Sequence, residues 1–400
     1  MEYIPVVGGL LKGYNAIPVY FNSYLASIAE PTTSRSWSLH EVYRHTLKIL
    51  KNKPEDLELY LDSGGYQIIT GHIKEKRIRE FTDTYHFVLE NLKDDIQKIF
   101  SLDINTPTFT EEKLIHYNDY SISSSIKLIQ KYPEIRNKQL FIVQSRVPRV
   151  LEDWLELMEK HSVENYYDLY SFGGLVGLKS ETKVHFNHFV PMTVWLMTYL
   201  KTKGKQPTQI HMLGQSSRVA MITGAILEKL FNIKVTMDSS EIVRFNPIGS
   251  KVPMLHKLEN NFNVITNLTE MTEMLKYHYD YQETEELEAK CALLEKGEVS
   301  NETYNMLLCQ NLKNLVDFAN HFMDDKPPVE ILNWTKEDFQ EYHDIFKIGR
   351  LSSEVYNNLA LLRKLLPFYE NNDFAGIHSY VKSIIESYYD GSKNRTGIID

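Results

Sequence analysis

Cysteine is scarce in this sequence, and its scarcity excludes two ways of stabilising a fold. Of 400 residues only two are cysteines, Cys291 and Cys309, and neither belongs to a Cys-x-x-Cys pair. Two cysteines cannot form a disulfide framework, and a zinc site built from several thiolates has no ligands at suitable spacing. We therefore expect stability to come from a hydrophobic core, which a chain of this length can form.

Long apolar runs are also lacking. No run approaches the roughly 20 residues that cross a membrane as a helix. The N-terminus, Met1-Glu2-Tyr3, lacks the basic segment followed by an apolar one that is typical of a secretion signal. These absences predict a cytoplasmic protein with no membrane partner.

An excess of positive charge is absent as well. The 44 lysines and arginines are outnumbered by 53 aspartates and glutamates, for a formal net charge of −9. This balance excludes a surface that is basic all over, but a local patch can still bind the phosphates of a nucleic acid. Candidate cations for the nucleic-acid backbone are Arg146, Arg149 and Arg218. Each of these can equally lie on an ordinary solvated face.

Short apolar runs alternate with longer amphipathic segments through the first two-thirds of the chain. Strand candidates lie at 58–61, 98–102, 139–143, 168–172, 209–213 and 234–237, with weaker ones at 3–7 and 262–266. Helical patterns between them include 78–92, 150–160, 190–200 and 217–231. Such alternation predicts an α/β protein with a parallel sheet. About eight repeats over roughly 270 residues favour a (β/α)₈ TIM-type barrel, with a doubly wound open sheet as the alternative.

From about residue 270 onward the pattern becomes mainly helical. Helical segments are expected at 286–294, 301–323, 354–369 and 373–389. We therefore predict a catalytic barrel over residues 1–270 and a mainly helical C-terminal region over residues 271–400.

Polar residues and glycines follow the predicted strands directly. They are Asp62-Ser63-Gly64-Gly65, Asp103, Gln144, Gly173-Gly174-Leu175, Gly214 and Asp238. In a TIM-type barrel the active site lies at the C-terminal ends of the strands. An isolated acid at such a position is commonly a helix N-cap, and Asp-Ser-Gly-Gly also forms ordinary turns. Because such residues follow one strand after another, the series indicates a functional site at the C-terminal end of the barrel, which we call the rim.

The same series resembles the tRNA-guanine transglycosylase family. The family pattern runs Asp-Ser-Gly-Gly-Phe-Gln, then Asp with a following Thr-Pro, then Val-Gln-Gly, Gly-Gly-Leu and Phe-Asp. Its counterparts here are 62–67, 103–108, 143–145, 173–175 and 237–238. Tyr66 replaces the phenylalanine of the first motif, Ser145 the glycine of the third, and Met237 the phenylalanine of the last. The resemblance covers about residues 55–245.

The resemblance implies an enzyme that breaks the bond between C1′ of a nucleotide and its base, through an oxocarbenium-like transition state. It implies that Asp238 is the nucleophile, which holds the sugar covalently, and that Asp62 is the general acid and base. Base-binding roles carry over to Ser63, Gly64, Tyr66, Asp103, Gln144, Gly173, Gly174 and Leu175. A carboxylate can accept from base N–H donors, an amide can donate and accept, and an aromatic ring can stack on the base.

The chain departs from the family at its zinc site. The Cys-x-Cys-x-x-Cys cluster is missing, and Gln310 stands where a later histidine ligand would be. We therefore expect no zinc and no other cofactor. Because that region helps the family to hold tRNA, we expect DNA more than tRNA, as in divergent relatives from phage and bacterial DNA-modification and defence islands. The target base would then be flipped out of the helix or taken from single-stranded DNA.

Two outcomes follow from the same covalent intermediate. Attack by a free base of the 7-deazaguanine type gives base exchange, which we prefer. Attack by water leaves an abasic site, as a DNA glycosylase acting on a modified viral base would do. A tRNA-guanine transglycosylase proper remains an alternative, as do a non-catalytic accessory subunit and a barrel enzyme acting on an unrelated small molecule. The presence of both Asp62 and Asp238 disfavours the accessory subunit.

Overall fold

A computed structural model gives the structure of most of the chain. It describes residues 1–6, 22–34, 37–53, 55, 57–104, 110–144, 148–173, 189–215, 218–239, 254–258, 261–265, 268–278, 285–298, 328–335, 337–338 and 351–396, together with single helical positions between 303 and 320.

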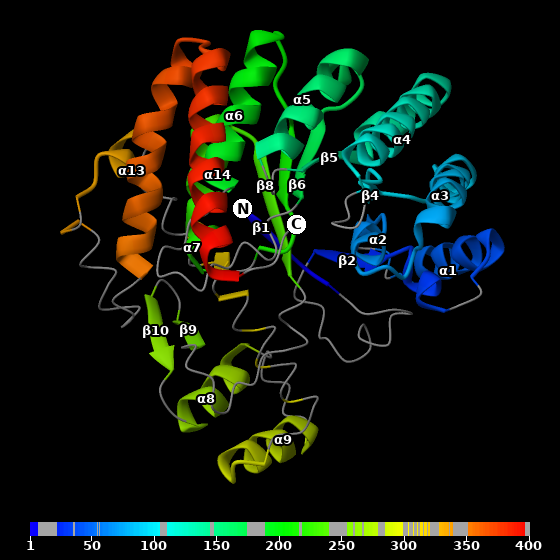
Figure 1. Cartoon of the computed structure of the whole chain (residues 1–400). Helices are drawn as coiled ribbons and strands as arrows, with labels where there is room; N and C mark the ends of the chain where they lie inside the picture. Colours follow the sequence, from blue (N-terminus) through cyan, green and yellow to red (C-terminus); the bar gives the residue numbers. More distant parts are fainter. Residues whose placement is uncertain are drawn as a thin grey trace.

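Eight parallel strands form a nearly closed barrel, which confirms the predicted (β/α)₈ TIM-type architecture (Figure 1). The strands are β1 (Glu2–Pro5), β2 (Ser23–Ser27), β3 (Glu58–Asp62), β4 (Lys98–Phe100), β5 (Gln139–Gln144), β6 (Leu169–Gly173), β7 (Gln209–Met212) and β8 (Lys234–Ser239). Each pairs with its neighbours in chain order, and β1 pairs with β8. A parallel bridge between Val6 and Leu25 joins β1 to β2.

One of the weaker strand predictions was wrong in its placement. The segment 262–266 corresponds to β10 (Asn261–Ile265), which pairs antiparallel with β9 (Met254–Leu258) in a separate two-stranded sheet. Two strands so close in sequence pair locally as a hairpin, because no crossover helix separates them. The remaining barrel strand is β2, which the sequence pattern did not reveal.

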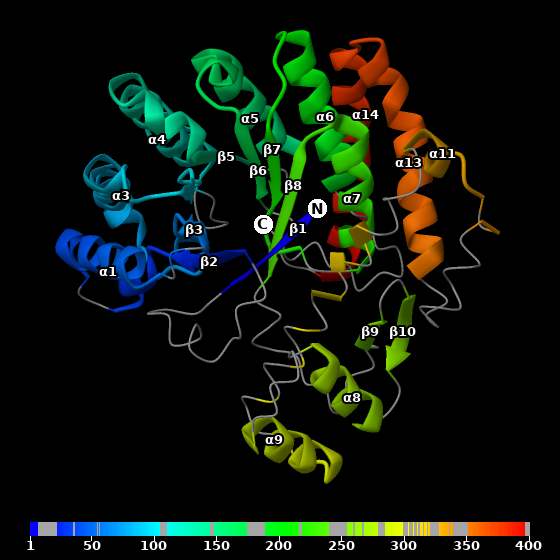
Figure 2. The same cartoon turned by 180° about the vertical axis from the view of Figure 1, so that it is seen from behind.

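Helices follow the strands and cover the outside of the barrel (Figures 1 and 2). They are α1 (Leu39–Asn52), α2 (Gly65–Ile69), α3 (Ile78–Leu92), α4 (Glu111–Lys131), α5 (Pro148–His161), α6 (Phe189–Thr202) and α7 (Arg218–Phe231). The start of α1 is fixed by a capping box, in which Ser38 and Glu41 satisfy each other's backbone N–H groups. No helix within the described residues is long and apolar enough to cross a membrane.

The last two helices of the C-terminal region pack on one side of the barrel. Residues 189–200 of α6 are all buried, and a helix that is apolar all round needs neighbours on every side. Helices α13 (Leu351–Glu370) and α14 (Phe374–Thr396) lie alongside α6 and cover its outer face (Figure 1). Trp195 Nε1 donates a hydrogen bond to His378 Nδ1 at 3.0 Å across this contact. The C-terminal region also contains, among the residues that the structure describes, α8 (Leu268–His278), α9 (Glu285–Glu295) and α11 (Pro328–Leu332).

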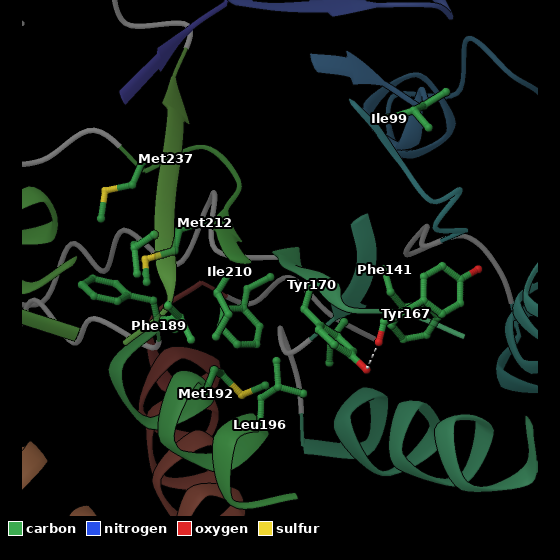
Figure 3. Packing of buried hydrophobic residues seen from close by; sticks show 14 of the residues in the cluster. Ile99, Phe141, Tyr167, Tyr170, Phe189, Met192, Leu196, Ile210, Met212 and Met237 are labelled. Carbon is green, nitrogen blue, oxygen red and sulfur yellow. Dashed lines mark hydrogen bonds between the residues drawn. The ribbon is translucent and has the colours of Figure 1, made fainter. Parts of the chain in front are cut away.

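Alternation along each strand separates the two cores of the barrel. Outward side chains such as Ile210 and Met212 pack against α6 in a large cluster shared with the helices (Figure 3). Inward side chains form a smaller cluster, which contains Ile4, Leu25, Tyr60, Phe100, Leu140, Ile142 and Leu169. Asp62 and Gln144 lie two residues beyond Tyr60 and Ile142, so they share the inward face. An apolar plug therefore lies beneath a polar rim.

Candidate active site

The structure brings the predicted acids and amide of the rim together. Asp62 ends β3, Gln144 ends β5 and Asp238 lies near the end of β8, while Asp103 follows β4 closely. The charge of Asp238 acts on the pKa of Asp62, and the charge of Asp62 acts on the pKa of Asp103. Gln144 Nε2 donates a hydrogen bond to Asp103 Oδ2. The rim is therefore a connected set of polar groups.

Asp62 has a raised pKa. Burial is the main cause, because an apolar surrounding disfavours the charged carboxylate, and the nearby charge of Asp238 adds to it. Hydrogen bonds from the Ser27 side chain and from the backbone N–H groups of Gly64 and Ser63 oppose the rise. Asp62 thus holds its proton to higher pH than an ordinary aspartate does, as a general acid requires.

The turn after β3 brings the backbone close to the acids. Gly64 has φ +97°, a left-handed conformation that favours glycine, and it forms the N-cap of α2. At Gly65, a Cβ atom would overlap Asp103 Oδ1. Ser63 is buried and its Oγ donates to the Ser101 carbonyl oxygen at 3.0 Å, so this hydroxyl links the ends of β3 and β4. Tyr66 is 64% exposed, which leaves its ring accessible for stacking.

Asp103 and Gln144 form a buried pair with an unused acceptor. Burial, together with the charge of Asp62, raises the pKa of Asp103 to about 6, while the hydrogen bond from Gln144 opposes the rise. Gln144 Oε1 is buried and has no hydrogen-bond partner among the residues that the structure describes. Such an orphan costs about 1–3 kcal/mol, which an N–H donor on a ligand would offset. At Gly173, a Cβ atom would overlap Gln144 Nε2, so only glycine leaves room for this amide.

The loop that carries Asp103 is held by a residue that the sequence pattern did not single out. Asn118, on α4, accepts from the Ile104 backbone N–H at 3.0 Å and donates to the Ile104 carbonyl oxygen at 3.1 Å. This two-point clamp fixes the backbone directly after Asp103. A buried asparagine within a helix gives no sequence signal of its own, since its partner is distant in sequence.

Asp238 is fixed by a histidine that the sequence analysis also missed. Asp238 Oδ1 lies 2.9 Å from His211 Nε2 and accepts from the Gly214 backbone N–H at 2.8 Å. The His211 side chain is completely buried, and its ring contacts the ring of Phe100 with 4.7 Å between centroids. His211 lies within β7, whereas the functional residues predicted from the sequence all follow a predicted strand. Its inward register, shared with Gln209, was the available signal.

A chain of polar groups continues from His211 into the barrel. His211 Nδ1 lies 2.8 Å from Thr236 Oγ1. Gln209 Nε2 donates both to Thr236 Oγ1 at 2.9 Å and to the Tyr60 hydroxyl at 3.0 Å. Buried hydrogen-bond networks of this kind restrict each member to one orientation.

Several predicted residues lie outside the part that can be described. Arg146, Gly174 and Leu175 are outside the described residues, and so are the side chains of Arg149 and Arg218, which lie in the first turns of α5 and α7. Their predicted contacts to base and phosphate stay predictions. Gln310, which the predicted resemblance aligns with a zinc-binding histidine, is buried and donates to Asn314 Oδ1 at 2.9 Å.

No family model matches this chain, and no curated protein matches it. Among the described residues, no group of three or more His, Cys, Asp and Glu side chains is arranged to hold a metal ion. The functional conclusion therefore rests on the geometry of the rim and on the sequence pattern that led to it.

Proposed function

We propose that this protein cleaves the N-glycosidic bond of a nucleotide whose base is flipped out of DNA into the rim. The observation that carries the proposal is the pair Asp62 and Asp238: one carboxyl group has a raised pKa, and the other is held by two N–H groups. Two neighbouring carboxyl groups in different environments are the usual equipment for glycosidic bond cleavage.

The proposed reaction proceeds in two displacements. A carboxylate oxygen of Asp238 attacks C1′ as the bond from C1′ to the base nitrogen breaks, and the bonding electrons leave with the base. Asp62 gives its proton to the departing base. In the second step an incoming nucleophile loses a proton to Asp62 and displaces Asp238 from C1′. Splitting one difficult substitution into two steps lowers the activation barrier of each step relative to a direct exchange.

The pair Asp103 and Gln144 supplies a means of reading the base. Gln144 Oε1 offers a buried acceptor, and the Asp103 carboxyl group lies directly beside the amide nitrogen. A base edge that presents adjacent N–H donors, as the Watson–Crick edge of guanine or 7-deazaguanine does, complements this pair. Tyr66 offers an exposed ring from the neighbouring turn for stacking on the base.

We prefer base exchange, with a free 7-deazaguanine-type base as the second substrate. Exchange requires the incoming base to occupy the place of the departing one. A pocket with specific acceptors serves both bases through the same contacts, whereas hydrolysis needs only a water molecule at that stage. Gln144 Oε1, a buried acceptor with no partner among the described residues, favours a pocket that binds a free base.

The test compares substrates and nucleophiles with one purified protein. Single-stranded DNA, duplex DNA, phage DNA and tRNA are each incubated with and without labelled guanine or 7-deazaguanine. The proposal expects label in DNA and none in the Asp238→Asn variant, with Asp95→Asn, an exposed aspartate in the turn after α3, as the matched control. Label in tRNA alone would overturn the choice of DNA. Alkali-labile sites formed without added base would decide for hydrolysis, and unchanged nucleic acids throughout would refute the proposed function.

A further inference from the structure

We infer that His211 is a positioning residue for Asp238, and that Oδ2 is the carboxylate oxygen of Asp238 that attacks C1′. The inference rests on the proposed function, because it concerns the nucleophile of that reaction.

The two donors at Asp238 converge on one oxygen. His211 Nε2 and the Gly214 backbone N–H both bond to Oδ1, at 2.9 and 2.8 Å. Oδ2 receives no hydrogen bond from any residue that the structure describes. Two donors on one oxygen prevent rotation of the carboxyl group, so the unbonded oxygen keeps a fixed direction. This leaves Oδ2 with its lone pairs available to an electrophilic carbon.

Gly214 contributes through its backbone conformation. It has φ +71°, a left-handed conformation that favours glycine, and it lies two residues beyond the end of β7. The turn directs its N–H toward β8 and Asp238 instead of along the sheet. The backbone N–H of Gly214 and the side chain of His211, both near the end of β7, thus fix the position of Asp238 Oδ1.

The hydrogen-bond network assigns the tautomer of His211. A carboxylate oxygen can only accept, so His211 Nε2 carries the proton that bonds to Asp238. Thr236 Oγ1 already accepts from Gln209 Nε2, so its own O–H is available to donate to His211 Nδ1. Gln209 is held in turn by the Tyr60 hydroxyl. The network therefore presents an N–H, and not a lone pair, to Asp238.

The imidazole ring has no freedom to take another orientation. It is stacked on the ring of Tyr60 with 6.2 Å between centroids, and the ring of Phe100 meets it edge-on. Removing the N–H without changing the volume would leave Asp238 free to rotate about its side-chain torsion. Loss of a residue that orients a reacting group commonly costs about 10–100-fold or more in rate. We expect the effect in kcat, since His211 does not touch the substrate.

Three variants test the inference. His211→Met removes the donor at similar volume, and His211→Gln restores an N–H at the position of Nε2. His86→Met is the matched control, because His86 is a partly buried histidine that bonds to Ser125 between α3 and α4, away from the rim. We expect kcat to fall about 100-fold in His211→Met and less than about 10-fold in His211→Gln, with KM for DNA unchanged in both.

The inference is overturned if His211→Met keeps the wild-type kcat, or if His211→Gln loses as much as His211→Met. A second measurement needs neither activity nor a stable variant. Nitrogen-15 NMR of the wild-type protein reports which imidazole nitrogen of His211 carries the proton. The inference expects Nε2, and a proton on Nδ1 alone would refute it. A wild-type protein that releases no base but carries the Nε2 proton would count against the proposed function and leave the geometry at Asp238 supported.

Discussion

Replacing Asp103 by asparagine should make the protein more stable at alkaline pH. The pKa of this buried carboxyl group rises from the ordinary 3.8 to about 6 in the folded protein. The folded state therefore binds more protons than the unfolded state between about pH 4 and pH 6, so stability falls as the pH rises through this window. Two pKa units correspond to about 3 kcal/mol, which is the cost of ionising Asp103 in place. Asparagine cannot ionise and avoids that cost.

The assay is urea unfolding of the wild-type protein and of Asp103→Asn, followed by tryptophan fluorescence at several pH values. The difference in unfolding free energy between variant and wild type should grow in favour of the variant by about 2 kcal/mol from pH 4 to pH 8. Using this change, not the difference at one pH, cancels any loss from an altered hydrogen bond to Gln144. The exposed Asp95→Asn control should show no such growth. A difference in unfolding free energy that stays constant across the pH range would refute the raised pKa of the buried Asp103 carboxyl group.

Three further predictions concern two more residues of the rim and one residue outside it. Asp62→Asn should lower kcat for base release by about 100-fold or more, because the proton donor is lost. In the wild type, kcat for base release should fall as the pH rises through the raised pKa of Asp62, and pH–rate profiles of both proteins check these expectations. Gly173→Ala should weaken binding of the base, seen as a higher KM, because the new Cβ displaces Gln144; an unchanged KM would contradict the role of this amide. Trp195→Phe should lower the free energy of unfolding by about 1–3 kcal/mol, because His378 Nδ1 loses its hydrogen-bond donor, and should leave kcat unchanged. Urea unfolding measures the first effect and an activity assay the second.

Much of the fold was accessible from the sequence because strands and helices alternate with clear periods. The segment 78–92 was predicted as a helix and is α3 with the same bounds. Strand β2 was missed because Ser-Tyr-Leu-Ala-Ser is short and only weakly apolar. Helix α4 was missed because its middle reads Ser-Ile-Ser-Ser-Ser-Ile, and serine is a poor helix former that tertiary contacts here override.

The predicted rim residues were found because they directly follow the predicted strands and match, in order, the motifs of a known family. Asp62 and Gln144 each follow an inward apolar residue at a spacing of two, so their side chains face the barrel axis. His211 and Asn118 escaped notice for a different reason. Their roles depend on partners far along the chain, Asp238 and Ile104, and only the assembled barrel reveals such contacts.

The rim shows a division between residues that react and residues that hold them. Asp62 and Asp238 carry the proposed chemistry, while Ser63 and His211 make the contacts that fix their surroundings. Burying charged and unpaired groups together lowers the free energy of unfolding, and such groups are concentrated at functional sites. The raised pKa values of Asp62 and Asp103 are the physical expression of that cost.

The central claim is that Asp238 forms a covalent bond to the sugar of a nucleic acid. The most direct measurement is mass spectrometry of the protein after a rapid acid quench of its reaction with DNA, followed by peptide mapping. The account predicts a nucleotide adduct on the peptide that contains Asp238, absent from Asp238→Asn and abundant in the wild type when no incoming base is supplied. Base release at the wild-type rate by Asp238→Asn, or an adduct on another residue, would contradict it.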